Sequence, residues 1–424
     1  MRAWQRPDVP SLDDLGLGRG ERPAVHDTKR DDRVVVPYGD SATMYTCGIT
    51  PYDATHLGHA FTYLAFDTLT RAWLDAGVPV RTAMNSTDVD DPLLERAARD
   101  GVDWRELAEQ QQELFREDMA ALRVIPPDAW IAVTERIDRI GDAVRRMVDS
   151  GDAYLLPVPE GDGAAEGAHD VLFDTTRTRA FPIGLGSRTD HDEMVALTRE
   201  FGGDPDRPGK RSPLDPLLWR AERPGEPAWE SAVGRGRPGW HVECTEIAMD
   251  ELGSPFTVAA GGRDLRFPHQ ELQAHHALAL GAPLFSEIRM GAGLVAYDGS
   301  KMSKSLGNLV LVSRLREAGA RPAAIRLALL AHHWRADWEW QDEELEAAEE
   351  RLDRWAAWAR TPGDDPSLED SIVPWLRVTI ASDLDTPAAL QAIDDFVLRA
   401  PADEGSLAAI DALLGIDLLA VEPR

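Results

Sequence analysis

The stretch that most restricts the fold of this chain lies between residues 43 and 74. Residues 43–50 are β-prone and break at Gly48, and His56-Leu57-Gly58-His59 then opens an apolar run that reaches about Leu74. A strand, a glycine-containing turn and a helix are how nucleotide-binding α/β units begin, with an anion favoured at the helix N-terminus. Two histidines beside a glycine also arise easily by chance, so this stretch indicates a fold class more strongly than a site.

The same pattern continues along the chain. Residues 78–84 are predicted to form a second strand, and further strands are expected at 256–260 and 286–290. Apolar residues at helical spacing predict amphipathic helices over 103–119 and 128–150. Strands that alternate with helices favour a parallel sheet of the Rossmann type.

Polar residues follow the second predicted strand directly. Asn85-Ser86-Thr87 stands where the carboxyl end of a strand meets a ligand in open α/β sheets. The acidic residues of 88–91 could instead provide the N-cap and first turn of a helix that continues through Leu93. The two interpretations are compatible.

Lysine is rare in this chain, which holds only Lys29, Lys210, Lys301 and Lys304. The last two lie in the pentapeptide Lys301-Met302-Ser303-Lys304-Ser305. A loop that places ammonium groups against a changing phosphate geometry needs the flexible point charge of Lys rather than the planar fork of Arg. The alternative is a polar surface loop that holds two lysines by chance.

The bulk composition limits the class of protein and its partners. At 424 residues the chain predicts two or three domains. A formal charge of −29 argues against a nucleic acid partner, which is usually gripped by a basic surface. Because no signal-like or membrane-spanning apolar run is found, we expect a cytoplasmic protein with no membrane partner.

Composition and patterning divide the chain into six segments. Residues 200–240 carry many Gly and Pro but also buried-type apolar residues, which indicates a structured insertion rather than a linker. The expected segments are an N-terminal arm (1–40), the first half of the α/β domain (41–130), a connective insertion (131–235), the second half of the α/β domain (236–295), the lysine-loop region (296–330) and a C-terminal helical bundle (331–424).

Several separate stretches resemble one family, the class I aminoacyl-tRNA synthetases, and within it the cysteinyl branch. His56-Leu57-Gly58-His59 is similar to the HIGH signature, and residues 301–305 match the KMSKS signature without a mismatch. The cysteinyl branch is resembled by Cys47-Gly48-Ile49-Thr50, by 85–91, by 236–244 and by Phe267-Pro268-His269. The resemblance implies a class I synthetase-like Rossmann catalytic domain with a connective insertion and a helical C-terminal part.

Within that branch the chain is more similar to the actinobacterial, tRNA-independent cysteine ligases of mycothiol biosynthesis. Residues 50–59 look like the ligase version, Pro92 stands where the synthetases usually carry Lys, and 200–205 resembles the ligase signature ERGGDP with Phe201 in place of Arg. Residues 306–424 also form a short C-terminal part for an anticodon-reading synthetase. This resemblance implies an ATP-dependent ligase that joins L-cysteine to the amine of glucosaminyl-inositol, acting as a monomer without nucleic acid.

The implied reaction activates cysteine as cysteinyl-adenylate with ATP and Mg²⁺ and then transfers the acyl group to an amine. The resemblance makes His56, His59, Lys301 and Lys304 the catalytic candidates, since adenylate formation depends mainly on charge neutralisation around a phosphate. It implies an ATP and cysteinyl-adenylate pocket made of Cys47, Gly48, Ile49, Thr50, Thr62, Asn85, Ser86, Thr87, Trp240, Gly262, Arg263, Asp264 and Val295.

The two cysteines do not form a disulfide framework and, on spacing alone, are buried thiols, metal ligands or a reactive pair. The resemblance implies one Zn²⁺ held by Cys47, Cys244 and His269, with the substrate sulfur completing a tetrahedron. A thiolate-binding ion separates cysteine from serine better than a pocket wall does. The synthetases carry a further carboxylate where this chain has Gln273. Glu271 has two interpretations, a residue that supports His269 or a charge on the helix surface.

Two other functions stay open from the sequence. One is a cysteinyl-tRNA synthetase, and the other is a non-catalytic relative that senses cysteine or its adenylate. The side chains that hold the sugar are not identified by the sequence, and Asp88, Asp91 and Glu243 are the candidates for a base that deprotonates its amine.

Overall fold

Runs of β-branched, aromatic and small residues build a parallel sheet at the centre of the protein. Neighbouring strands follow the order β11-β10-β3-β4-β5. Their bounds are β3 (Ala42–Ile49), β4 (Val80–Ser86), β5 (Ala129–Ala132), β10 (Phe256–Gly262) and β11 (Ser286–Ala292). The order reverses between β3 and β10, so the carboxyl ends of these two strands flank the crevice in which such sheets bind ligands. The predicted Rossmann-type sheet is confirmed.

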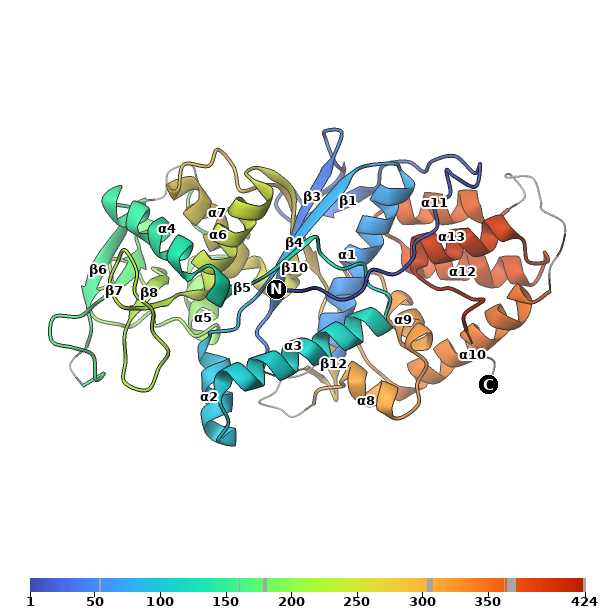
Figure 1. Cartoon of the computed structure of the whole chain (residues 1–424). Helices are drawn as coiled ribbons and strands as arrows, with labels where there is room; N and C mark the ends of the chain where they lie inside the picture. The colour runs from blue at the N-terminus through green and yellow to red at the C-terminus, as the bar shows by residue number, and fades with distance from the viewer. Residues whose placement is uncertain are drawn as a thin grey trace.

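The structure is a computed structural model that describes residues 1–52, 55–159, 161–177, 181–302, 308–361, 363 and 371–421, with the side chain of Lys301 left out (Figure 1). Figure 1 shows the insertion at one end of the molecule, the sheet in the middle and the C-terminal helices at the other end. Among the described residues, no helix combines the length and the apolar character that crossing a bilayer requires.

Helices cover both faces of the sheet because alternate residues of β3 are apolar on both sides. Met44 belongs to the core shared with α1 (Leu57–Asp75), whereas Tyr45 and Cys47 belong to the core shared with α6 (Trp240–Leu252). The second core also includes α4 (Ile137–Asp149) and α7 (His269–Ala279). Two-sided burial explains why the strands read as nearly continuous apolar runs.

The helix predicted over residues 128–150 is wrong at its start. Residues 129–132 form strand β5, a single 3-10 turn spans Val133–Glu135, and the helix begins only at Ile137. Trp130 explains the difference, because its ring packs edge-on against Trp4 and next to Phe115 while its strand pairs with β4. Packing partners distant in sequence override the local helical pattern here.

The remaining elements surround this core. The N-terminal residues form a hairpin of β1 (Ala24–Asp27) and β2 (Asp32–Val35). An antiparallel sheet of the insertion joins β6 (Ala153–Pro157), β7 (His169–Phe173), β8 (Leu217–Ala221) and β9 (Gly236–Pro238). A small sheet joins β12 (Val295–Tyr297), β13 (Ser300–Lys301) and β14 (Trp338–Glu339). The other α-helices are α2 (Asp91–Asp100), α3 (Trp104–Ala121), α5 (His191–Glu200), α8 (Val312–Glu317), α9 (Pro322–Leu330), α10 (Asp342–Ala359), α11 (Val373–Ala381), α12 (Thr386–Val397) and α13 (Glu404–Leu414). Two further 3-10 turns span Thr175–Arg177 and Arg263–Arg266. The division into six segments stays a prediction.

A buried ion network joins α1 to the C-terminal helices. The Asp67 carboxylate on α1 pairs with Arg71, at 2.8 Å, and with Arg326 on α9, and all three side chains are almost fully buried. The guanidiniums also donate to carbonyl oxygens: Arg326 to Leu122 and Leu414, and Arg71 to Arg123, Asp411 and Ala412. Burial raises the pKa of Asp67, but the two guanidiniums and the Ile125 N–H outweigh it and hold the pKa below its ordinary value.

Substitution Asp67→Ala is expected to lower the free energy of unfolding by about 3–5 kcal/mol, because it leaves two buried guanidiniums without their counter-charge. The carboxylate is charged above its unfolded-state pKa of about 4, so its stabilisation is lost as the pH falls through the folded pKa. Urea unfolding at pH 7 measures the effect. The control is Glu317→Ala, which removes an exposed pair with Arg314 and should change stability by less than about 1 kcal/mol. An equally small effect of Asp67→Ala would contradict the role of this network.

Candidate active site

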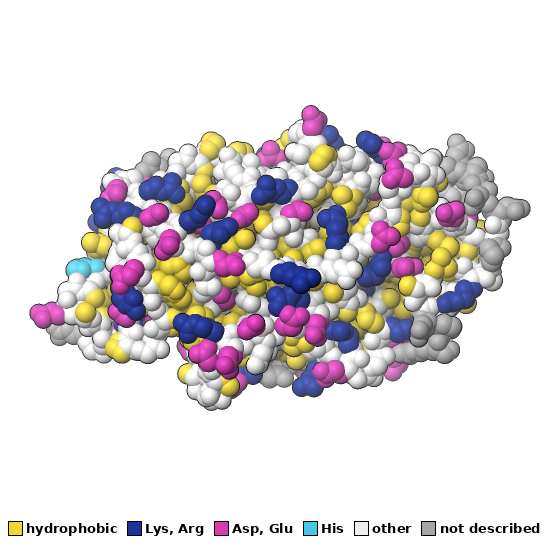
Figure 2. Space-filling model, in the orientation of Figure 1, with side chains coloured by type: hydrophobic (Ala, Val, Ile, Leu, Met, Phe, Trp, Pro, Cys, Tyr) yellow, Lys and Arg dark blue, Asp and Glu magenta, His cyan; other side chains and the backbone are white. Residues whose placement is uncertain are grey.

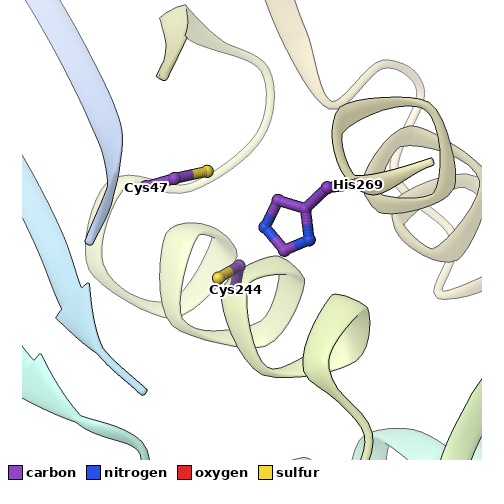
Figure 3. A group of neighbouring side chains, drawn as sticks. All are labelled: Cys47, Cys244 and His269. Atoms are coloured by element: carbon purple, nitrogen blue, oxygen red, sulfur yellow. The ribbon is translucent and has the colours of Figure 1, made fainter. Parts of the chain in front are cut away.

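The three predicted metal ligands come together at the carboxyl end of the sheet. Cys47 lies near the end of β3, Cys244 lies in α6 and His269 is the first residue of α7. Their ligand atoms all lie within 4.8 Å of one another, and all three residues are buried. Figure 3 shows the two thiols and the imidazole pointing into one common space. Two sulfurs and an imidazole nitrogen are the donor types that zinc prefers, so the residues fit this metal.

Hydrogen bonds select the tautomer of His269. The amide nitrogen of Gln273 lies 3.3 Å from His269 Nε2, and an amide N–H only donates, so Nε2 is the acceptor. Assigning the ring proton to Nδ1 is consistent with both contacts, since Nδ1 lies 2.9 Å from Nδ1 of His241. Desolvation lowers the pKa of His241 to about 3, so that ring is neutral and accepts this proton. The Nε2 lone pair is thereby free of a proton, as a metal ligand requires.

Glu271 has neither of the two roles considered from the sequence, because it is buried and its carboxylate pairs with groups other than His269. Glu271 does not contact the ring: its carboxylate accepts from the backbone N–H of Gly184 and Gly186 and pairs with Arg289 at 3.0 Å. It therefore anchors the insertion to α7. His241 supports the ring instead, and its place directly after Trp240 in a cysteinyl-branch stretch was the signal that could have found it.

Burial sets the protonation of the pair of thiols. Burial, followed by the neighbouring Cys47, raises the pKa of the Cys244 thiol well above its ordinary value. A metal ligand must be a thiolate, so metal binding at this position would release the thiol proton.

Hydrogen bonds join the predicted pocket residues at the end of β3 to those at the end of β4. The Asn85 side-chain oxygen accepts from Tyr45 Oη at 2.9 Å and from Gly48 N–H at 2.8 Å, and its amide donates to Thr87. A Cβ at Gly48 would lie 1.6 Å from the Asn85 carbonyl oxygen. Glycine is therefore required at position 48 for β3 to lie this close to β4. The hydrogen bonds of the Asn85 side chain stabilise this close packing of the two strands. Ile49 lies opposite Ser86 in the same pair of strands.

The two histidines of the first motif stand at the N-terminus of α1. His56 is the N-cap residue, and its Nδ1 accepts from Gly58 N–H at 3.1 Å. The His56 and His59 rings stack with centroids 3.8 Å apart. A Cβ at Gly58 would lie 3.0 Å from the His56 ring, so glycine leaves room for this cap. Thr62, predicted for the pocket, donates its hydroxyl to Gly58 C=O at 3.0 Å.

The segment that follows the lysine loop is hydrogen-bonded to this helix start. Leu57 N–H donates to Val310 C=O and Val312 N–H donates to Thr55 C=O, both at 2.9 Å, with His56 opposite Leu311. The Lys301 side chain and all of Lys304 lie outside the described residues, so their catalytic roles stay predictions. The described chain on the C-terminal side of the loop nonetheless reaches His56.

The end of β10 and Trp240 complete the site. Trp240 stacks on His269, with ring centroids 4.2 Å apart, and also on Phe201, with ring centroids 6.1 Å apart. The Arg263 guanidinium donates to Asp337 Oδ1 and to Arg335 C=O, both at 2.7 Å, so it faces the C-terminal half. The structure places the remaining predicted pocket residues as follows: Thr50 directly follows β3, Gly262 ends β10, Asp264 lies in the turn that follows, and Val295 begins β12.

The acidic residues considered as proton acceptors differ in their surroundings. Asp88 accepts from Thr134 N–H at 3.0 Å and from its hydroxyl at 2.5 Å, and Asp91 pairs with Arg237, so both have structural partners. Burial raises the pKa of Glu243 well above its ordinary value.

Comparisons with known proteins identify the family of this chain. Residues 34–350 match the family described as tRNA synthetases class I (C) catalytic domain. The chain is 54% identical to the L-cysteine:1D-myo-inositol 2-amino-2-deoxy-alpha-D-glucopyranoside ligase of Clavibacter michiganensis subsp. michiganensis, over 99% of both chains. It is 52% identical to the ligase of the same name from Kineococcus radiotolerans, over 99% of this chain and 100% of the relative.

Solved structures support the fold. Mycobacterium tuberculosis methionyl-tRNA synthetase in complex with methionyl-adenylate matches with a TM-score of 0.59 at 19% identity, over 89% of this chain and 88% of that one. A structure described as a putative arginyl-tRNA synthetase from Campylobacter jejuni matches with a TM-score of 0.53 at 12% identity, over 96% and 94%. The match over residues 34–350, together with the near full-length identity to the curated relatives, shows that the chain belongs to the class I (C) tRNA synthetase catalytic-domain family.

Proposed function

We propose that this protein is an ATP-dependent ligase that joins L-cysteine to the amine of glucosaminyl-inositol in mycothiol biosynthesis. The observation that carries the proposal is the meeting of Cys47, Cys244 and His269 beside the crevice between β3 and β10. That crevice is where an adenylate is bound in this fold class, and a soft-donor metal set selects a thiol substrate. The names of relatives about half identical over the full chain supply the acceptor.

The reaction has two balanced steps. In the first, a carboxylate oxygen of cysteine attacks the α-phosphorus of ATP, the α–β phosphate bond breaks and pyrophosphate leaves. In the second, the unprotonated amine attacks the acyl carbon, the bond to the phosphate oxygen breaks, and AMP and one proton are released. Cysteinyl-adenylate links the two steps.

Residues of this chain neutralise and position the reacting groups. His56 and His59 stand at the positive N-terminus of α1, where we propose that they contact the triphosphate. Lys301 and Lys304 are proposed to add two ammonium groups from a loop whose C-terminal flank is bonded to residues 55–57. Mg²⁺ would accompany ATP. The charge spread over the phosphates in the transition state is thus met by fixed positive groups.

Cys47, Cys244 and His269 would hold one Zn²⁺ per chain. The bound ion would stabilise the substrate as a thiolate at the open fourth position, which serine cannot match. Trp240 stacks on His269 and is proposed to cover the cysteine amino group. Gly48 lets β3 lie close to β4, and its hydrogen bond to Asn85 is proposed to fix the end of β3 beside the adenylate.

The proposed partners are L-cysteine, ATP and the amino-sugar inositol, in a monomer that works in the cytoplasm without nucleic acid. On the face drawn in Figure 2, Lys and Arg side chains lie among Asp and Glu side chains rather than gathered in one basic area. With a formal charge of −29, the chain is a poor electrostatic match for tRNA.

The proposed function predicts which acceptor releases AMP. With cysteine and ATP, AMP release is expected to depend on glucosaminyl-inositol and to stay at the background rate with tRNA, because the acceptor site takes a small amine. AMP release with tRNA alone would make the protein a cysteinyl-tRNA synthetase. Absence of cysteine-dependent ATP–pyrophosphate exchange would favour a non-catalytic sensor of cysteine.

Substitution Cys244→Ser is expected to remove bound zinc and cysteine activation together. Changes beside a metal ligand already weaken metal binding by about 10–100-fold, so loss of a ligand should exceed about 100-fold. Elemental analysis of the purified variant and cysteine-dependent ATP–pyrophosphate exchange measure the two effects. A thermal melt checks that the variant is folded, and retained exchange without metal would overturn the zinc assignment.

A further inference from the structure

Gln273 is a buried polar residue whose amide is directed at the predicted metal ligands. It lies in α7 four residues after His269, on the same face of the helix, and only 1% of its surface is exposed. Its amide nitrogen is 3.3 Å from His269 Nε2 and 3.9 Å from Cys47 Sγ. Its side-chain oxygen is buried without a hydrogen-bond partner. A buried amide with one half unpaired needs a reason beyond packing.

The contact to His269 cannot persist when that nitrogen ligates a cation. The Nε2 lone pair is the acceptor of the Gln273 N–H, and the same lone pair binds a metal. Of the two acceptors that the amide nitrogen contacts, only Cys47 Sγ is then left. A thiolate is a much better acceptor than a thiol, because hydrogen bonds to charged groups are about twice as strong.

The neutrality of Gln273 matters for the charge of the pocket. Two thiolates cancel the charge of one divalent cation, and the sulfur of the substrate adds one negative charge when it arrives. A carboxylate at position 273 would make the set negative before the substrate binds, and would itself be a ligand. In a buried site such excess charge is costly.

We propose that Gln273 is a positioning and specificity-determining residue for the substrate thiol. Its amide N–H donates to the Cys47 thiolate, and its neutral side chain leaves the remaining face of the ligand set to the sulfur of the substrate. The inference rests on the proposed function only in taking a metal-bound cysteine as the substrate.

Two variants separate the hydrogen bond from the charge. Gln273→Leu removes the N–H with an apolar side chain that cannot bind a metal, and Gln273→Glu adds a negative ligand. Both are loaded with Co²⁺, whose absorption spectrum reports thiolate ligands and coordination, and are titrated with L-cysteine. The control Gln391→Glu adds the same charge on the exposed face of α12.

Each variant has a distinct expected spectrum. Gln273→Leu should shift the thiolate-to-cobalt charge-transfer band to lower energy, because the Cys47 thiolate loses a hydrogen bond. Gln273→Glu should retain Co²⁺ but bind L-cysteine at least about tenfold more weakly, since outer contacts of metal sites carry effects of about 10–100-fold. Gln391→Glu should match the unmodified protein in both readouts.

The proposal is overturned if Gln273→Leu leaves the charge-transfer band and the cysteine affinity unchanged. The spectrum and the cysteine affinity of Gln273→Leu test the proposal even if Gln273→Glu does not fold. If the unmodified protein binds cysteine at cobalt but releases no AMP with the amino-sugar acceptor, the proposed function fails while the role of Gln273 is still tested by the spectra.

Discussion

The rest of the structure depends on the carboxylate of Asp67. It sits inside the protein on α1, and its two guanidinium partners extend to the turn after α3, to α9 and to the end of α13. A buried charge tolerates no loss of a partner, so these parts cannot shift against α1 without a large penalty. The same helix carries His56 and His59 at its N-terminus. The network therefore fixes the C-terminal half of the chain relative to the proposed phosphate contacts.

This fixed relation explains how two distant parts of the sequence form one site. The backbone of residues 310–312 bonds to residues 55–57, which needs no particular side chains. The Asn308 side chain, just before that segment, donates to Tyr297 C=O of β12 at 2.9 Å. Phe61 of α1 packs edge-on against Trp338 of β14. The short sheet of β12, β13 and β14 is thus held against α1 from both ends of the lysine loop. Rigid flanks place a loop more exactly than its own contacts could.

Much of the fold could be predicted because its strands have local signatures. Gly48 and the run before it marked β3, and Asn85-Ser86-Thr87 marked the end of β4. Strand β5 was missed because Trp130 finds its partners in Trp4 and Phe115, which no local pattern reveals. The metal ligands came from resemblance to a family, since 197 positions separate Cys47 from Cys244 and no local spacing joins them. His241 lies in a stretch that resembles the same family, but its contact with His269 depends on the packing of α6 against α7 and was not predicted.

The distribution of charge connects this architecture with the choice of acceptor. Arginines such as Arg71, Arg289 and Arg326 form buried ion pairs, in which one planar guanidinium can donate to several acceptors at once. Each such pair takes one positive and one negative charge away from the surface, and the formal charge of −29 comes from the excess of 74 acidic over 45 basic residues. An acidic molecule attracts a protonated amine and repels a polyanion over the range of a Debye length. ATP is an exception that needs local positive groups, and the sparse lysines of one loop are suited to supply them. The inward use of arginine and the placing of two neighbouring lysines in one loop are therefore both consistent with the proposed function, in which a triphosphate and an amine are bound and a longer phosphate chain is not.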